Sequence, residues 1–298
     1  MTTLKIAATQ FELRAERSLD EFLAHVEALV RKAAGQGAEL VVFPELASTG
    51  LLGAISDHAV TTKTVQSDYW NVLPAFTGDL LAGLQQVAAE HGVIVAGGSH
   101  NRVAEDGSLR NTAYLVRPDG HVEFQDKLHL TPQEHDLGAR GGDELLITAI
   151  GPFTAGLLIC ADIQFPELAR YLVHMGVDLI LCPSLTWNRR GVHRVRTGCQ
   201  ARAIENQLYV VMSPLVGTSG LPADAPMHAV GEALVTGPVD KIIGKNDGVM
   251  GIAEGDGEDI LLVELDHDLL LASRANPETP GLNLRRLDLF QKLASELA

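Results

Sequence analysis

The sequence has no apolar run that approaches the roughly 18 to 20 residues of a membrane-spanning helix. It also lacks an excess of basic residues, because 23 lysines and arginines stand against 38 aspartates and glutamates, a formal net charge of -15. Since a field of this sign repels polyanions, we expect no nucleic acid as a partner, and the lack of a long apolar run predicts no membrane partner. Met1–Phe11 has no basic region and no cleavage site of an export signal, which predicts a cytoplasmic protein.

Cysteine is scarce, and the three that occur are Cys160, Cys182 and Cys199. The odd number and the spacing match no paired zinc motif, which favours free thiols in a reducing compartment. The chain also lacks a phosphate-binding loop of the Gly-x-x-x-x-Gly-Lys-Ser/Thr type and any repeat of fixed period. We therefore expect no metal and no cofactor, and interpret Cys182 and Cys199 as packing residues.

The composition is that of a folded protein, and the order of the apolar patterns predicts an α/β fold. With 46% apolar residues in 298, the chain can bury a full core, and we expect one domain over residues 1–298. Apolar runs typical of strands, such as Leu4–Phe11 and Glu39–Glu45, alternate with helical patterns along the chain. The first helix is predicted to follow an N-cap at Ser18 and to run to about Ala34.

Cys160 lies where a strand gives way to a helix. The run Phe153–Cys160 predicts a strand, and Pro166–His174 predicts a helix that opens shortly after it. Backbone N–H groups at such a turn can hold a developing oxyanion and lower the pKa of a thiol. A buried structural cysteine is the alternative, because free cysteine is among the most buried residue types.

Two charged residues end other predicted strands. Glu45 closes Glu39–Glu45, and Lys127 closes His121–Lys127. Taken alone, Glu45 could be a helix cap or a salt-bridge partner at the rim, and Lys127 could be a solvated surface lysine. Because ligands of open α/β sheets bind beyond the carboxyl ends of the strands, we expect both side chains to approach Cys160 there.

Motifs along almost the whole chain resemble those of one family, the nitrilase superfamily of carbon–nitrogen hydrolases. The matching stretches are Phe43-Pro44-Glu45, Gly97-Gly98-Ser99, Asn111-Thr112-Ala113, Lys127-Leu128-His129-Leu130 followed by Glu134, Ile159-Cys160-Ala161-Asp162, Phe165-Pro166-Glu167, Cys182-Pro183-Ser184, and Ala201-Arg202-Ala203-Ile204-Glu205-Asn206-Gln207.

The resemblance implies a fold, a site and an assembly. The fold would be a four-layer αββα sandwich. Glu45 would be the general base, Lys127 the oxyanion stabiliser, Cys160 the nucleophile, and Glu134 a second carboxylate that orients the substrate and supports the others. Protomers of the family dock through helices near the cysteine, which predicts a homodimer or higher homo-oligomer. The helix after Pro166 fits this, with apolar side chains at helical spacing: Leu168, Tyr171, Leu172 and Met175. Alternatively, that face packs only on the sheet.

The resemblance also implies a reaction, in which a small-molecule amide loses ammonia or an amine through a thioester on Cys160. Asp162 is similar to the amidase branches, whereas relatives that act on nitriles carry Glu there. Ala161 replaces the usual aromatic residue and implies a wider pocket beside the nucleophile. A nitrilase, an N-carbamoyl amide hydrolase, an acyltransferase and a binding protein without activity are the alternatives.

Two further residues are candidates for substrate binding. Trp187 could form a pocket wall, or it could be a packed aromatic residue. Arg194 could reach a carboxylate of the substrate, or it could lie on a solvated helix face. The sequence leaves both alternatives open.

Overall fold

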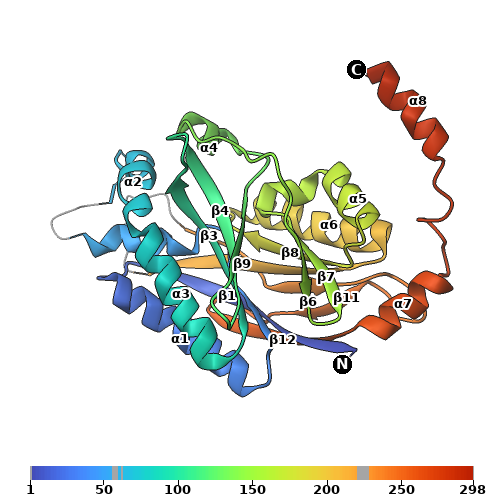
Figure 1. Cartoon of the computed structure of the whole chain (residues 1–298), viewed down its shortest axis with the longest axis horizontal. Helices are drawn as coiled ribbons and strands as arrows, with labels where there is room; N and C mark the ends of the chain where they lie inside the picture. The colour runs from blue at the N-terminus through green and yellow to red at the C-terminus, as the bar shows by residue number, and fades with distance from the viewer. Residues whose placement is uncertain (1, 56–59, 62, 220–227, 298) are drawn as a thin grey trace.

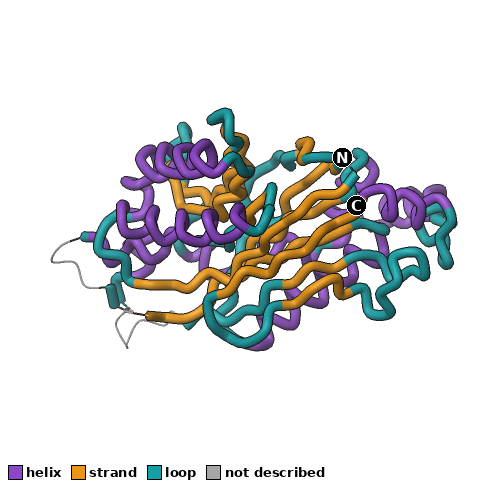
Figure 2. Tube along the Cα trace, turned by 90° about the horizontal axis from the view of Figure 1, so that it is seen from below, coloured by secondary structure: helices purple, strands orange, loops and turns teal. Residues whose placement is uncertain are grey.

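Two β-sheets lie face to face in the middle of the molecule, and helices cover their outer faces (Figures 1 and 2). This arrangement is that of a computed structural model, which describes residues 2–55, 60–61, 63–219 and 228–297. The order helix, sheet, sheet, helix confirms the predicted α/β sandwich, because each sheet buries one face on the other sheet and one face on helices.

The first sheet is built by the N-terminal half of the chain and one late strand. Its strands are β1 (Thr3–Arg14), β2 (Leu40–Val42), β3 (Ile94–Val103), β4 (Leu109–Val116), β5 (Val122–Asp126) and β12 (Asp259–Asp266). They lie in the order β5-β4-β3-β2-β1-β12. The strands β1, β2 and β3 run parallel, so their carboxyl ends meet at one edge of the sheet.

The second sheet follows the same plan. Its strands are β6 (Ile147–Ile150), β7 (Phe153–Leu157), β8 (Leu179–Ser184), β9 (Tyr209–Ser219), β10 (Leu234–Thr236) and β11 (Val249–Ile252). They lie in the order β6-β7-β8-β9-β10-β11, and β7, β8 and β9 run parallel. The end of β1 pairs with the end of β9, with Phe11 opposite Leu215. These two strands therefore join the two sheets.

The helices complete the outer layers. The longer ones are α1 (Leu19–Gly35), α3 (Thr77–His91), α5 (Pro166–His174), α6 (Arg189–Asn206), α7 (His267–Ala275) and α8 (Leu287–Leu297); the short ones are α2 (Val65–Asn71), α4 (Pro132–Asp136) and the 3₁₀ helices η1 (Ala47–Ala54), η2 (Leu73–Phe76) and η3 (Cys160–Gln164). Helices α1 and α3 lie on the first sheet, α5 and α6 on the second, and α8 stands apart from both (Figure 1). None of the helices in the described ranges has the length and hydrophobicity that a membrane crossing requires.

Alternation along β1 divides its side chains between two cores. Ile6 and Ala8 belong to the core shared with the second sheet, whereas Ala7 and Phe11 belong to the core under α1 and α3. The predicted cap of α1 is confirmed, because the Ser18 side chain accepts a hydrogen bond from the backbone N–H of Glu21 at 3.1 Å. The cap and the buried face of α1 fix its position on the sheet.

Three predicted strands are shorter than the sequence indicates. The strand Glu39–Glu45 ends as β2 at Val42, because Pro44 has no N–H for the ladder. The strand Phe153–Cys160 ends as β7 at Leu157, and Cys160 begins η3. Lys127 follows β5 rather than ending it. The helix Pro166–His174 is confirmed with its predicted bounds.

Candidate active site

The backbone turns sharply at Cys160. Its φ angle is 47°, in the left-handed region that a residue with a Cβ adopts only at a cost. Asp162 supports the turn, since its buried carboxylate accepts the backbone N–H of Ile159 at 3.2 Å. The same carboxylate accepts the backbone N–H of His129 at 2.7 Å. Asp162 therefore ties the Cys160 turn to the segment that follows Lys127.

A second tight turn carries Glu45. Pro44 places its carbonyl so close to Gly98 that a Cβ there would lie 2.0 Å from the oxygen, and Gly98 has a φ of 71°. Only glycine fits this approach. The backbone N–H of Ser99 donates to the Pro44 carbonyl at 3.1 Å, and the Ser99 hydroxyl accepts the N–H of Leu46 at 2.9 Å. β3 thus holds the turn on both sides of Glu45.

Lys127 lies at the centre of a buried charge cluster. Its Nζ atom is 2.6 Å from Glu45 Oε1 and 2.7 Å from Glu134 Oε2, and the side chain is 1% exposed. Residues 82 and 7 positions away in the chain thereby meet one ammonium group. A lysine so placed is not a solvated surface residue, and the alternative for Lys127 is excluded.

Glu134 is held by the start of α4. Its Oε2 atom accepts the backbone N–H of Thr131 at 2.8 Å and the Thr131 hydroxyl at 2.9 Å, and the Thr131 hydroxyl accepts the N–H of Glu134 in return. This reciprocal pair is a capping box. Because the carboxylate also contacts Lys127, the capping box fixes a charged group of the site rather than only a helix end.

Burial and charge separate the two carboxylates. Burial raises the pKa of Glu45 above its ordinary value, and the nearby charge of Glu134 adds to this, while Lys127 opposes it. For Glu134, burial also raises the pKa, but Lys127 and several hydrogen bonds outweigh it and leave the pKa lowered. Glu134 therefore stays ionised, and Glu45 is the better proton acceptor.

Lys127 remains charged despite its burial. Burial lowers the pKa of the ammonium group, but Glu45 and Glu134 outweigh this and hold it above its usual range. The Cys160 thiol behaves in the opposite way, because burial and the charge of Glu45 raise its pKa well above the ordinary value. The expectation that the turn lowers this pKa is wrong. The thiol is protonated at rest and needs a base during attack.

The sequence of the chain matches one protein family over most of its length. The family model of the carbon–nitrogen hydrolases matches residues 5–269, which is most of the chain. The chain belongs to the carbon–nitrogen hydrolase family.

Individual members of the carbon–nitrogen hydrolase family resemble the chain at moderate identity. The "Probable hydrolase YhcX" of Bacillus subtilis is 32% identical over 96% of this chain, but the chain spans only 54% of that protein. The "Nitrilase" of Pyrococcus abyssi is 28% identical over 86% of this chain and 88% of its own length. An amidase from Nesterenkonia sp. AN1, solved as a double mutant with acrylamide, has the same fold, with a TM-score of 0.76 at 20% identity over 98% of both chains.

The carbon–nitrogen hydrolase fold places the other predicted site residues unequally. Ala161 follows Cys160 and is partly buried. Trp187 is partly buried and packs on the core under α1 and α3. Arg194 is exposed on α6 and lines an open surface pocket of about 410 Å³ with Gln164 and Thr197. No hydrogen bond or ion pair in the described part of the chain joins Arg194 to the cluster.

Sequence reasoning missed two residues of the cluster's surroundings. Asn111, on β4, donates hydrogen bonds to Glu45 and Glu134. Tyr69, on α2, is 9% exposed, and burial together with the charges of those two carboxylates raises its pKa to about 12. The motif around Asn111 carried a signal, whereas α2 was not predicted and gave none for Tyr69.

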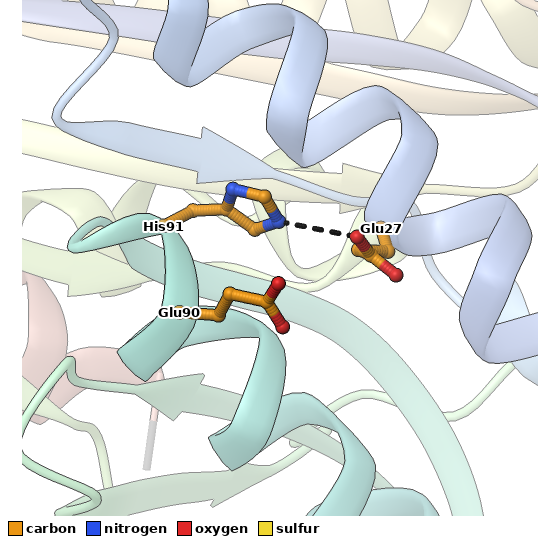
Figure 3. Close-up of side chains that lie close together, drawn as sticks. All are labelled: Glu27, Glu90 and His91. Atoms are coloured by element: carbon orange, nitrogen blue, oxygen red, sulfur yellow. Dashed lines mark ion pairs between the residues drawn. The ribbon is translucent and has the colours of Figure 1, made fainter.

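A second group of charged side chains lies away from the cluster. Figure 3 shows Glu27 of α1 with Glu90 and His91 at the end of α3, whose possible ligand atoms lie within 4.8 Å of one another. His91 Nε2 is 3.5 Å from Glu27 Oε1, and Arg31 is a further partner of Glu27 at 3.6 Å. Because Glu90 is exposed and the group joins two outer helices, we interpret it as an ion-pair contact between them.

Proposed function

We propose that the protein hydrolyses the carbon–nitrogen bond of a small amide through a thioester on Cys160. The observation that carries this proposal is the buried ammonium group of Lys127, 2.6 and 2.7 Å from two carboxylates, beside a thiol on a strained turn. A fixed positive charge in a site that excludes water is suited to a developing oxyanion. The two carboxylates differ in pKa, as acid–base catalysis requires.

Acylation would begin with transfer of the Cys160 proton to Glu45. The thiolate then adds to the amide carbon, and Lys127 with the Ala161 N–H stabilises the oxyanion. Glu45 returns its proton to the leaving nitrogen as the carbon–nitrogen bond breaks, which releases ammonia or an amine and leaves a thioester. Each group ends this step in the state in which it began, apart from the acylated sulfur.

Deacylation would use the same groups in the same places. Glu45 takes a proton from water, the hydroxide adds to the thioester carbon, and the thiolate leaves and regains the proton. Glu134, whose pKa is lowered, stays ionised and keeps Lys127 in place throughout. The reaction needs no metal in this scheme, because Lys127 and backbone N–H groups provide the electrophilic stabilisation.

A nitrile is the second candidate substrate. The Pyrococcus relative is called a nitrilase and matches 86% of this chain, which favours this candidate. Asp162 favours the amide, because it resembles the amidase branches.

The test is the release of ammonia from a panel of small amides, ω-amides, N-carbamoyl compounds and nitriles. Cys160→Ser and Cys160→Ala should abolish release and keep the fold, whereas Cys182→Ser, in a fully buried cysteine of β8, should keep activity. Retained release in the Cys160 variants would contradict the proposal. Acid from nitriles without turnover of any amide would support the second candidate.

We also propose that two or more copies of the chain assemble through α5. Leu172 is fully buried and Leu168 packs on the core, but Tyr171 and Met175 are 51% and 50% exposed. The predicted apolar face is thus divided between the sheet and the surface. Ile204 of the neighbouring α6 is 47% exposed as well, so the two helices share an apolar surface suited to a second copy.

A cytoplasmic location is part of the same proposal. All three cysteines are free and buried. Thiols persist in this form in a reducing compartment.

A further inference from the structure

A buried amide lies between the two carboxylates of the site. Asn111 Nδ2 donates one hydrogen bond to Glu45 Oε1 at 3.0 Å and another to Glu134 Oε1 at 2.7 Å. The side chain is 1% exposed, so bulk water does not compete for these bonds. Hydrogen bonds to ionised acceptors are the strong ones, and a low local dielectric strengthens them further.

Chemistry fixes the orientation of this amide. The opposite orientation would turn Asn111 Oδ1 toward two carboxylate oxygens, with which it cannot form a hydrogen bond. In the observed orientation Oδ1 has no hydrogen-bond partner among the described residues. An unpartnered buried carbonyl is costly. The two hydrogen bonds to the carboxylates offset that cost, which indicates that the role of the Asn111 amide is to bind Glu45 and Glu134.

Asn111 and Lys127 both contact the same oxygen of Glu45. Glu45 Oε1 accepts both Lys127 Nζ, at 2.6 Å, and Asn111 Nδ2. Its other oxygen, Oε2, accepts neither of these donors, and the Cys160 thiol donates at rest to the backbone carbonyl of Leu185 at 3.4 Å. The backbone carbonyl of Asn111 also accepts the backbone N–H of Lys127 at 2.8 Å. Asn111 therefore contacts both carboxylates through its side chain and the backbone of Lys127 through its own backbone.

We propose that Asn111 is a positioning residue, which holds Glu45 and Glu134 side by side as anions and directs Glu45 Oε2 toward Cys160. The inference rests on the proposed function of this site and deepens it. The titratable groups that face Glu45 are Lys127 after β5, Glu134 from α4, Cys160 from η3 and Tyr69 from α2. Asn111 donates to both carboxylates and carries no charge itself.

The test follows alkylation of Cys160 by iodoacetamide as a function of pH, with the modified peptide measured by mass spectrometry. Asn111→Ala removes both donated bonds, so the anion of Glu45 is less stable and its pKa rises. We expect the acid limb of the alkylation profile to move up by roughly one pH unit. Asn111→Asp keeps the size and adds a like charge, and should move the limb further in the same direction.

The matched control is Asn206→Ala. Asn206 is also fully buried with an unpartnered Oδ1, but its Nδ2 donates to the carbonyl of Arg202 instead of to a carboxylate. This variant can lower the melting temperature, but its acid limb should stay at the wild-type position. If Asn111→Ala does not fold, Asn111→Asp carries the test.

An acid limb of the Asn111 variants at the wild-type position, or an equal shift in Asn206→Ala, would overturn the inference. The probe reacts with the thiol and needs no amide substrate. Failure of the substrate panel would therefore overturn the proposed function alone, and an unshifted limb would overturn the role of Asn111 alone.

Discussion

Lys127→Met removes the positive charge of the cluster and keeps most of the length of the side chain. The variant leaves two carboxylates buried side by side, since Glu45 is 3% exposed and Glu134 is 8% exposed. Removal of one partner of a buried ion pair typically lowers the free energy of unfolding by about 3 to 5 kcal/mol. In large domains each kcal/mol lowers the melting temperature by about 2 to 4 °C, so we expect a fall of roughly 10 °C at pH 7.

The stability difference between the wild type and Lys127→Met should depend on pH, and the titration of Glu134 gives the sign of this dependence. In the wild type its pKa is lowered, because Lys127 outweighs burial. Its contribution to stability is therefore present above the unfolded pKa and lost as the pH falls through the folded one. In the variant, burial and Glu45 raise the Glu134 pKa, so its contribution is present below the unfolded pKa and lost as the pH rises. The stability gap between the two proteins should narrow from pH 7 toward about pH 4.

The assay is differential scanning calorimetry of both proteins across this pH range. The control is Lys292→Met, which removes the exposed partner of Glu296 at 4.0 Å and should change the melting temperature by less than about 3 °C. A gap of the same size at every pH, or a loss no larger than that of the control, would refute the account of the buried cluster. Hydrolysis by Lys127→Met should fall by about two to three decades.

Four further predictions address the roles of single parts. Glu45→Gln should lower acylation by about two to four decades and abolish the burst with an activated ester, whereas Glu134→Gln should keep a slow burst; the reverse order would exchange the two roles. Gly98→Ala should lower both stability and activity, because its Cβ would lie 2.0 Å from the Pro44 carbonyl, whereas Gly107→Ala, with a φ of 77° and open space, should lower only stability, by about 1 kcal/mol. Chelators should leave hydrolysis unchanged, and a large loss that zinc reverses would contradict the metal-free scheme. Light scattering at micromolar concentration should show at least a dimer, and a wild-type monomer would remove the proposal for α5.

Local physical chemistry accounts for the parts that the sequence predicts well. The cap at Ser18 and the helix start at Pro166 depend on neighbouring residues, and both are confirmed. The order of strands and helices is likewise visible as hydrophobic periodicity. The predicted ends of β2 and β7 are wrong, because the turns at Glu45 and Cys160 require backbone conformations that periodicity does not encode.

The family motifs in the sequence alone were sufficient to name Glu45, Lys127, Glu134 and Cys160. Only the tertiary structure decided how these groups differ in charge, because the pKa of each depends on burial and on partners up to 82 positions away. The same holds for Asn111, whose carboxylate partners lie 66 and 23 positions away, and for Arg194, which the fold leaves exposed on α6. The sequence states which residue types are present. The electrostatic interactions between them depend on distance and local dielectric, which are set only when the chain folds.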